Sequence, residues 1–409
     1  VGLTVADSSP AGRHAGISNG SPTWISGMRS NALSLNGSVD EAITNNKFKP
    51  PATGTVAFWF KRNAAAIGRE RPFGLATDWE AWQDPDGILR FDLDADGEQG
   101  GFKTLTSLSE VDRWYHVAAV FDAATDAFAI YVDGQLHHSG ISTRDLVAQT
   151  AARLSFGTRT GATEHFNGAI DDFRVFNRKL TAAEVSEIYG LLAWYKLDET
   201  SGTVAADSTG LGNSGAYVGS PVLGVASNGN GAMGTAVTFN GSNNVQVSGM
   251  YGNPANVSVS AWIKMNAADS SGAEIISLGD HFLLRIRPGG VGLDAVYYNG
   301  STWMTASTSL PVGAKWRHVA ATFTQSGALA IYVDGLEMAS TPAGSISYAG
   351  LGQNTSIATH GNSSTTYDYA GTIDDVRVYD RGLGPMEVFR LFQGSRLNGL
   401  RIIKWVEVR

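Results

Sequence analysis

Three aspartates alternate along one short segment, and paired carboxylates are the groups that hydrolyse glycosidic bonds. The segment reads Asp92-x-Asp94-x-Asp96, so on a β-strand all three side chains would share one face. A glycosidase needs two carboxyl groups across a cleft, one as the acid and one as the nucleophile or base. We find no such pair in the sequence and read the segment as a solvated hairpin arm. We therefore predict no catalytic residues and a protein that is not an enzyme.

Aromatic side chains gather at two places where they could stack on sugar rings. Trp79 and Trp82 fall in a polar stretch that reads as a loop, and Tyr298 and Trp303 flank a turn. A sugar site needs such rings beside a few polar groups. These four residues are candidate ligand-binding residues. The alternative is that the rings cover a face of a β-sandwich.

The composition excludes several classes of function. The 409 residues carry 30 basic and 38 acidic side chains, a formal charge of −8, without the basic runs that nucleic-acid binding requires. No stretch reaches the 18 apolar residues of a membrane span. Cysteine is absent, which rules out disulfides and thiolate metal sites and fits an exported bacterial protein; the alternative is a cytosolic protein without cysteine. The chain begins at Val1, which we interpret as the start of a mature or excised product.

The sequence contains one unit written twice. Three motifs recur at offsets of 201, 202 and 203 residues: Ile130–Gly134 with Ile331–Gly335, Trp114–Ala119 with Trp316–Ala321, and Gly168–Val175 with Gly371–Val378. A period near 200 residues is too long for a solenoid and indicates two homologous domains. We place them at residues 1–190 and 191–394, with a tail at 395–409.

Each unit has the pattern of an antiparallel β-protein. Short β-branched and aromatic runs are separated by turn residues, among them Asp133-Gly134 and Asp334-Gly335, which favour two-residue hairpins. Thr181 and Glu184 form a capping box for a short closing helix. The predicted fold is all-β: two tandem antiparallel β-sandwich jelly rolls, each closed by a short C-terminal helix, plus an extra C-terminal strand.

The order of these motifs resembles the laminin-G-like jelly roll of the concanavalin A-like lectin/glucanase superfamily. The family's order is Leu-x-Phe-Asn-Gly (here Leu-Ser-Leu-Asn-Gly at 33–37 and Val-Thr-Phe-Asn-Gly at 237–241), Trp-x-His-Val-Ala, Ile-Tyr-Val-Asp-Gly and Gly-x-Ile-Asp-Asp-x-Arg-Val, followed by the closing helix. The family's catalytic strand carries glutamates at its outer positions, and Asp92 and Asp96 stand there instead. The same fold serves lectins, adhesins, glycosidases and spacers, so the resemblance implies a fold more than a function.

The resemblance also implies a structural Ca²⁺ between the first strand-turn and the Ile-Asp-Asp strand. The residues that match its oxygen ligands in the second repeat are Asp198, Asp207, Asn213 and Asp374. In the first repeat only Asp7 and Asp171 remain, and backbone carbonyls would have to complete the shell of six to eight oxygens. The alternative is that these aspartates form Asx-turns or pair with nearby arginines.

The two repeats differ at their ends. The second repeat opens with an alternating strand containing Trp194, and the first repeat lacks that strand. The tail carries a spare strand. If this tail ran into the start of a second copy, Trp405 would precede the first repeat by nearly as many residues as Trp194 precedes the second. The apolar residues of the spare strand are Ile402, Ile403, Trp405, Val406 and Val408. We expect this strand to fill the vacancy by β-strand addition in the next copy, giving a head-to-tail filament. The alternatives are a cleaved first strand or an arm that reaches another domain.

Two functions follow from these observations. The first is an extracellular, non-catalytic, adhesive cell-surface protein of a bacterium, self-associating as a filament subunit. The second is a glycan-binding module excised from a larger adhesin or polysaccharide-active enzyme. Glycans are possible partners of either, and neither nucleic acid nor a membrane span is expected.

Overall fold

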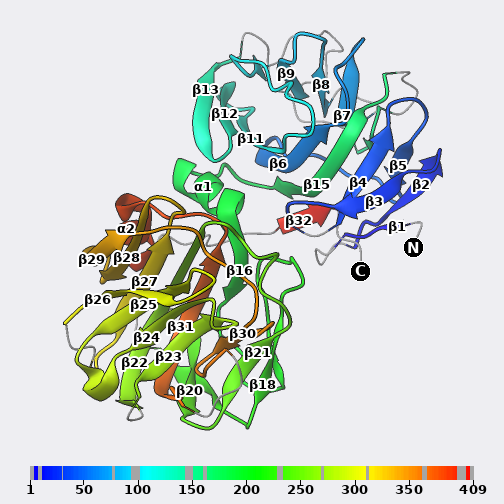
Figure 1. Ribbon diagram of the computed structural model, residues 1–409. Helices are drawn as coiled ribbons and strands as arrows, with labels where there is room; N and C mark the ends of the chain where they lie inside the picture. Colours follow the sequence, from blue (N-terminus) through cyan, green and yellow to red (C-terminus); the bar gives the residue numbers. More distant parts are fainter. Residues whose placement is uncertain are drawn as a thin grey trace. The chain divides into compact units, whose positions relative to one another are not determined.

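The structure is a computed structural model, and it confirms the predicted fold class. It describes residues 4–7, 12–29, 31–75, 79–93, 102–142, 151–159, 164–227, 234–268, 271–309, 313–361, 366–393 and 402–405. The chain forms two compact units. Unit 1 comprises residues 1–189 and 397–409, and unit 2 comprises residues 190–396, each a sandwich of two antiparallel sheets with one short helix (Figure 1).

Unit 1 packs two sheets face to face. The first sheet, in spatial order, holds β1 (Thr4–Val5), β2 (Ala15–Asn19), β5 (Glu41–Thr44), β14 (Leu154–Phe156), β7 (Glu70–Leu75), β8 (Trp79–Gln83), β9 (Leu89–Leu93) and β10 (Phe102–Lys103). The second holds β13 (Gln135–Ile141), β12 (Ala127–Val132), β11 (Tyr115–Asp122), β6 (Thr53–Arg62), β15 (Asn167–Phe176), β4 (Asn31–Asn36) and β3 (Thr23–Ser26), with β32 (Ile402–Trp405) also on β15.

Unit 2 repeats this arrangement. One sheet holds β17 (Val204–Ala205), β18 (Gly215–Val218), β21 (Asn244–Val247), β30 (Thr355–Ile357), β23 (Ala273–Leu278), β24 (Phe282–Ile286), β25 (Leu293–Tyr298) and β26 (Trp303–Ser307). The other holds β19 (Val222–Ala226), β20 (Thr235–Asn240), β31 (Tyr369–Tyr379), β22 (Val257–Ala268), β27 (Arg317–Phe323), β28 (Ala328–Val333) and β29 (Leu336–Pro342), with β16 (Leu191–Tyr195) on β31. A single 3₁₀ turn, η1, spans Pro288–Gly290.

The alternation of side chains along β6 shows how each core forms. Phe58 and Phe60 point between the sheets of unit 1 and are fully buried. Trp59 points to the other face, where its ring stacks on Tyr189 at 5.3 Å between centroids. Burial of such rings supplies most of the stabilisation of a sandwich. The same division holds in unit 2, where Trp262 stacks on Phe392.

The predicted turns and helix caps are present. Asp133 and Asp334 have φ of 49° and 51°, and the glycines that follow have φ of 75° and 79°, as a two-residue hairpin with both φ positive requires. Helix α1 (Ala182–Gly190) begins after Thr181, whose hydroxyl and amide both bond Glu184 in a capping box. Helix α2 (Pro385–Phe392) begins after Gly384. Each helix packs on the outer face of a sheet.

The tail strand adds to its own chain, which corrects the head-to-tail prediction. Strand β32, red in Figure 1, pairs antiparallel with β15, and Trp405 lies opposite Phe173. In unit 2, β16 pairs with β31 in the same way. A strand tethered to the chain that it completes has a high effective concentration, so a second copy competes poorly for the position. The structure gives no support to a filament, because the vacancy is filled from within.

The register of the tail also differs from the expected one. Lys404 lies opposite Arg174, and Trp194 lies opposite the repeat equivalent, Arg377. Lys404 therefore occupies the position of Trp194, and Trp405 that of Tyr195. Of the other tail residues, Ile402 and Ile403 pair with β15, whereas Val406 and Val408 lie outside the described residues.

Candidate functional site

The first pair of candidate sugar-binding residues is buried, which corrects their prediction as a loop platform. Trp79 and Trp82 lie on β8 and are only 1% and 2% exposed. The Trp79 ring contacts Phe73 at 5.4 Å between centroids, and the Arg69 guanidinium covers Trp82. A sugar cannot stack on a ring that has no exposed face. The polar residues around them suggested a loop, whereas these residues belong to a strand that is buried on both faces.

The second pair forms an open aromatic surface. Tyr298 ends β25 and Trp303 begins β26, so the two lie opposite each other across the hairpin, with ring centroids 5.0 Å apart. Trp303 is 47% exposed, and among the described tryptophans it is the one that is exposed. Its Nε1 donates to the backbone carbonyl of Asp280 at 3.2 Å, which fixes the ring orientation. This surface is presented by a rigid hairpin and not by a mobile side chain.

The turn under this surface is longer than the predicted two-residue turn. Four residues, 299–302, connect the strands, and Asn299 Oδ1 accepts from the amides of Ser301 and Thr302 at 2.9 Å. Gly300 has φ of 100°, which favours glycine, whereas Asn299 does not have a positive φ. An Asx-turn therefore closes the hairpin. The exposed hydroxyl of Ser301 supplies a polar group beside the rings.

The expected calcium ligands of unit 2 divide into two groups. Asp207 is saturated by local bonds: its Oδ1 accepts from the amides of Trp194 and Thr209, and its Oδ2 accepts from the amide of Asn213 at 3.2 Å. The side-chain amide of Asn213 donates to the carbonyl of Leu192. These two residues form the Asx-turn network that was the alternative to metal binding.

Asp374 and Asp198 form the other group, and here oxygen atoms lack partners. Asp374 on β31 is fully buried, and neither carboxylate oxygen has a donor within 3.5 Å among the described residues, although the backbone of Asp375 acts to lower its pKa. Burial raises the pKa of Asp374 to about 9, and the carboxylates of Asp375 and Asp198 add to the rise. Asp198 accepts from the amide of Thr235 at 2.8 Å, and the buried Oγ1 of Thr235 also lacks a partner. These oxygens fit a hard cation such as Ca²⁺.

The equivalent position in unit 1 is supplied with donors by the protein. Asp171, the repeat counterpart of Asp374, accepts from the amide of Arg29 at 2.8 Å, although burial still raises its pKa to about 6. Asp7 accepts from the amide of Arg13 at 2.7 Å within its own turn. The oxygen atoms that a cation would require are therefore already used in unit 1, in contrast to those of Asp374.

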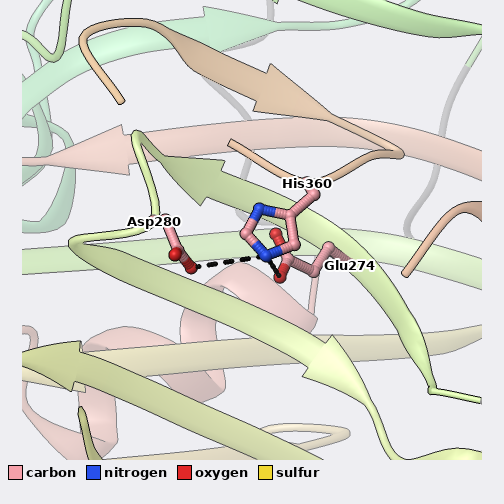
Figure 2. A group of neighbouring side chains, drawn as sticks. All are labelled: Glu274, Asp280 and His360. Carbon is pink, nitrogen blue, oxygen red and sulfur yellow. Dashed lines mark ion pairs between the residues drawn. The ribbon is translucent and has the colours of Figure 1, made fainter. Parts of the chain in front are cut away.

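A third group of side chains in unit 2 was not predicted from the sequence. Glu274, Asp280 and His360 are buried, and one potential ligand atom of each lies within 4.8 Å of the others (Figure 2). The Nε2 atom of His360 lies 3.8 Å from Glu274 Oε1 and 3.7 Å from Asp280 Oδ1. Burial, together with the neighbouring Asp280, raises the pKa of Glu274 to about 8, and burial raises that of Asp280 to about 6.

The comparison with known proteins decides the family. A family model described as the concanavalin A-like lectin/glucanases superfamily matches residues 11–186 and 239–389, which is more than half of the chain. The chain belongs to this superfamily. No curated protein matches it. The two matched ranges fall one in each unit.

Several solved structures of this superfamily's fold are similar to the chain. Domain 4 of an extracellular arabinanase from Geobacillus stearothermophilus, solved with arabinotriose, is 23% identical over 50% of this chain and 98% of that one, with a TM-score of 0.39. Domains LG4-5 of the mouse laminin alpha1 chain are 13% identical over 94% and 95%, with a TM-score of 0.30. A sialidase carbohydrate-binding module from Ruminococcus gnavus, bound to sialyllactose, is 15% identical over 34% and 83%, with a TM-score of 0.30.

Two further expectations concern acids and membranes. Asp92 lies on β9 and is only 3% exposed, whereas Asp94 and Asp96 lie outside the described residues. Within the described part of the chain, no helix is long and apolar enough to cross a membrane.

A buried histidine gives unit 2 a predictable response to acid. His318 packs between Trp262 and Phe392, and its complete burial lowers its pKa to about 3. An unfolded histidine titrates near 6.5, so the unfolded state binds one more proton between pH 6.5 and 3, and stability falls as the pH falls through this window. We expect His318→Phe to reduce the loss of unfolding free energy between pH 6.5 and 5, measured by urea unfolding at constant calcium. Equal pH slopes for the two proteins would contradict this assignment.

Proposed function

We propose that the chain is a glycan-binding module without catalytic activity and that the sugar rests on the surface formed by Tyr298 and Trp303. The observation that carries the proposal is the exposed Trp303 ring, which lies tilted against Tyr298 across the hairpin. The superfamily includes lectins, which agrees with this proposal. We also propose that the protein lies outside the cell, where it would meet its glycan ligand. A copy bound to a cell surface would act in adhesion.

The physical basis is the pairing of an apolar sugar face with an exposed ring. Water solvates the Trp303 face poorly, and covering it with the C–H groups of a pyranose or furanose gains about 25 cal/mol for each Å² of apolar surface. The ring is already oriented by its bond to the carbonyl of Asp280, so little side-chain entropy is lost on binding. The exposed hydroxyl of Ser301 donates to Asn299 Oδ1 at 2.9 Å and keeps the capacity to accept a hydrogen bond from a sugar hydroxyl.

The substitution Trp303→Ala tests this proposal. We expect at least a tenfold loss of affinity for the bound sugar, since removing an aromatic anchor from a binding site costs about 2 kcal/mol or more. Binding is measured first on a glycan array that includes arabinotriose and sialyllactose, and then by calorimetry with the best oligosaccharide. Met386→Ala is the control, because Met386 is an exposed apolar side chain that lies on α2 and not on this hairpin. The proposal is wrong if the wild-type protein binds no glycan or if Trp303→Ala binds as tightly.

We further propose that unit 2 binds one structural Ca²⁺ through Asp198, Asp374 and Thr235. Its support is the buried carboxylate oxygens of Asp374 and the buried Oγ1 of Thr235, which lack partners and which a hard cation would satisfy, with Asp198 beside them. Backbone carbonyls and water would complete the shell. Unit 1 would bind none there, because Asp171 already accepts from a backbone amide.

A further inference from the structure

We propose that Glu274, Asp280 and His360 form a second metal site in unit 2, one that takes a divalent transition-metal ion of the zinc class. This site does not share a residue with the calcium site proposed above, and it does not depend on glycan binding. Three features of the structure carry it: the convergence of three donors, a buried carboxylate without a partner, and a contrast with unit 1.

The three donors come from separate segments that the fold brings together. Glu274 lies on β23, Asp280 lies in the tight turn between β23 and β24, and His360 follows β30. Figure 2 shows the three side chains pointing toward one another. Ligands of a tetrahedral Zn²⁺ at about 2.0–2.2 Å from the ion lie about 3.4 Å apart. The observed separations of 3.7 and 3.8 Å from His360 Nε2 are a few tenths of an ångström from that geometry.

Glu274 supplies the observation that points to an ion. It is 0% exposed, and neither of its carboxylate oxygens has a donor within 3.5 Å among the described residues, although Ser277 and the backbone of Gly361 still act to lower its pKa. The nearby cation, Arg285, directs its Nε and Nη2 to Asp294 at 3.3 and 3.2 Å. A buried carboxylate without a donor is costly unless a cation coordinates it or it takes up a proton. The carboxylate is aimed at two further metal-ligating groups, which favours the cation.

The equivalent position in unit 1 contains a cation built into the protein. The strand registers place Arg71 where unit 2 has Glu274, and Arg159 where it has His360. Arg71 bonds Glu80 at 2.9 Å, and Arg159 lies 3.5 Å from the same carboxylate. Unit 1 thus balances buried acid with guanidinium groups. Unit 2 has neither arginine at this position and has two carboxylates and an imidazole instead. A bound metal ion would supply the positive charge that the arginines supply in unit 1.

The donor set selects the class of metal. Ca²⁺ takes six to eight oxygen ligands, and this buried position offers two carboxylates and an imidazole nitrogen. Histidine with carboxylates is a usual ligand set of Zn²⁺ and of neighbouring first-row metals. Three protein ligands leave a fourth position for water. Asp280 and His360 are each about one-tenth exposed at the side chain, so the ion would reach the site from their side.

Titration of the chelator-treated full chain with ZnCl₂ tests the proposal. We expect one Zn²⁺ per chain by calorimetry and by metal analysis after gel filtration, and at least a hundredfold weaker binding in Glu274→Gln, which keeps the shape and removes the charge. With CoCl₂ as the probe, we expect visible absorption bands of a four- or five-coordinate ion that vanish in the same variant. Excess Ca²⁺ should not displace either metal.

Two controls keep the result interpretable. Asp374→Asn should bind Zn²⁺ as the wild type does, because it alters the other proposed site. His360→Gln, at the more exposed end, serves as the second variant if Glu274→Gln fails to fold, and it too should lose the tight site. The proposal is overturned if the wild-type chain takes up no Zn²⁺ above surface binding, if Glu274→Gln or His360→Gln binds with unchanged affinity, or if Ca²⁺ displaces the metal.

Discussion

Ending the chain after Gln393 is expected to destabilise unit 1 by about 3–5 kcal/mol while leaving unit 2 unchanged. The deletion removes β32, whose four residues pair with Phe173–Phe176 of β15. Each lost backbone hydrogen bond costs about 0.5–1.5 kcal/mol, and the edge of β15 becomes exposed to water. Phe173 and Val175 are fully buried in the complete chain and would lose part of that burial. Although the deleted residues follow unit 2 in the sequence, the loss of stability is expected in unit 1.

Calorimetry of the full and shortened chains measures this effect. Two matched substitutions assign the transitions. Val175→Ala should lower the transition temperature of unit 1, and Val378→Ala, at the equivalent position of β31, should lower the transition temperature of unit 2. The shortened chain should then shift the transition that Val175→Ala shifts. If both transitions of the shortened chain stay in place, β32 contributes nothing to unit 1.

The second large effect is expected at Asp374. In the presence of a chelator, Asp374→Asn should be at least as stable as the wild type, because it removes a buried carboxylate whose oxygens have no donors. Calcium at 100 times its Kd should stabilise wild-type unit 2 by about 2.7 kcal/mol and leave the variant unaffected. The measurement is urea unfolding with EDTA and with CaCl₂.

Asp171→Asn is the matched control for this experiment. Asp171 is the repeat counterpart in unit 1 and accepts from the amide of Arg29, so its substitution should leave the calcium response of unit 2 intact. If calcium still stabilises Asp374→Asn, the ion binds at another position and the proposed calcium site is wrong.

The sequence was sufficient for the fold because its signals are local or repeated. The Asp-Gly turns, the capping box at Thr181 and the recurrent strand motifs each follow from short-range chemistry, and the structure contains them. The vacancy in the first repeat and the spare strand at the end were also recognisable. Which molecule the strand completes was not, because sequence complementarity is the same for a strand in the same chain and for one in another copy.

The candidate sites were harder to predict because they depend on burial and on long-range contacts. Spacing could not distinguish Trp82, covered by Arg69, from Trp303, which is exposed. The calcium set included Asp207, whose oxygens are occupied by backbone amides; the sequence offered this Asx-turn as an alternative but could not decide between it and a metal. Glu274 and His360 are 86 residues apart in the chain (360 − 274) and meet only through strand pairing. Aligning the repeats and noting arginines replaced by an acid and a histidine would have drawn attention to them.

The placement of β32 sets an order for biosynthesis. Every residue of unit 2 leaves the ribosome before the last strand of unit 1 does, so the N-terminal half of the chain must remain one strand short while the C-terminal half matures. During that interval the open edge of β15 is the part of the nascent protein most exposed to wrong pairing, and any prematurely terminated product keeps that defect permanently. The strand that completes unit 1 is thus synthesised after the whole of unit 2.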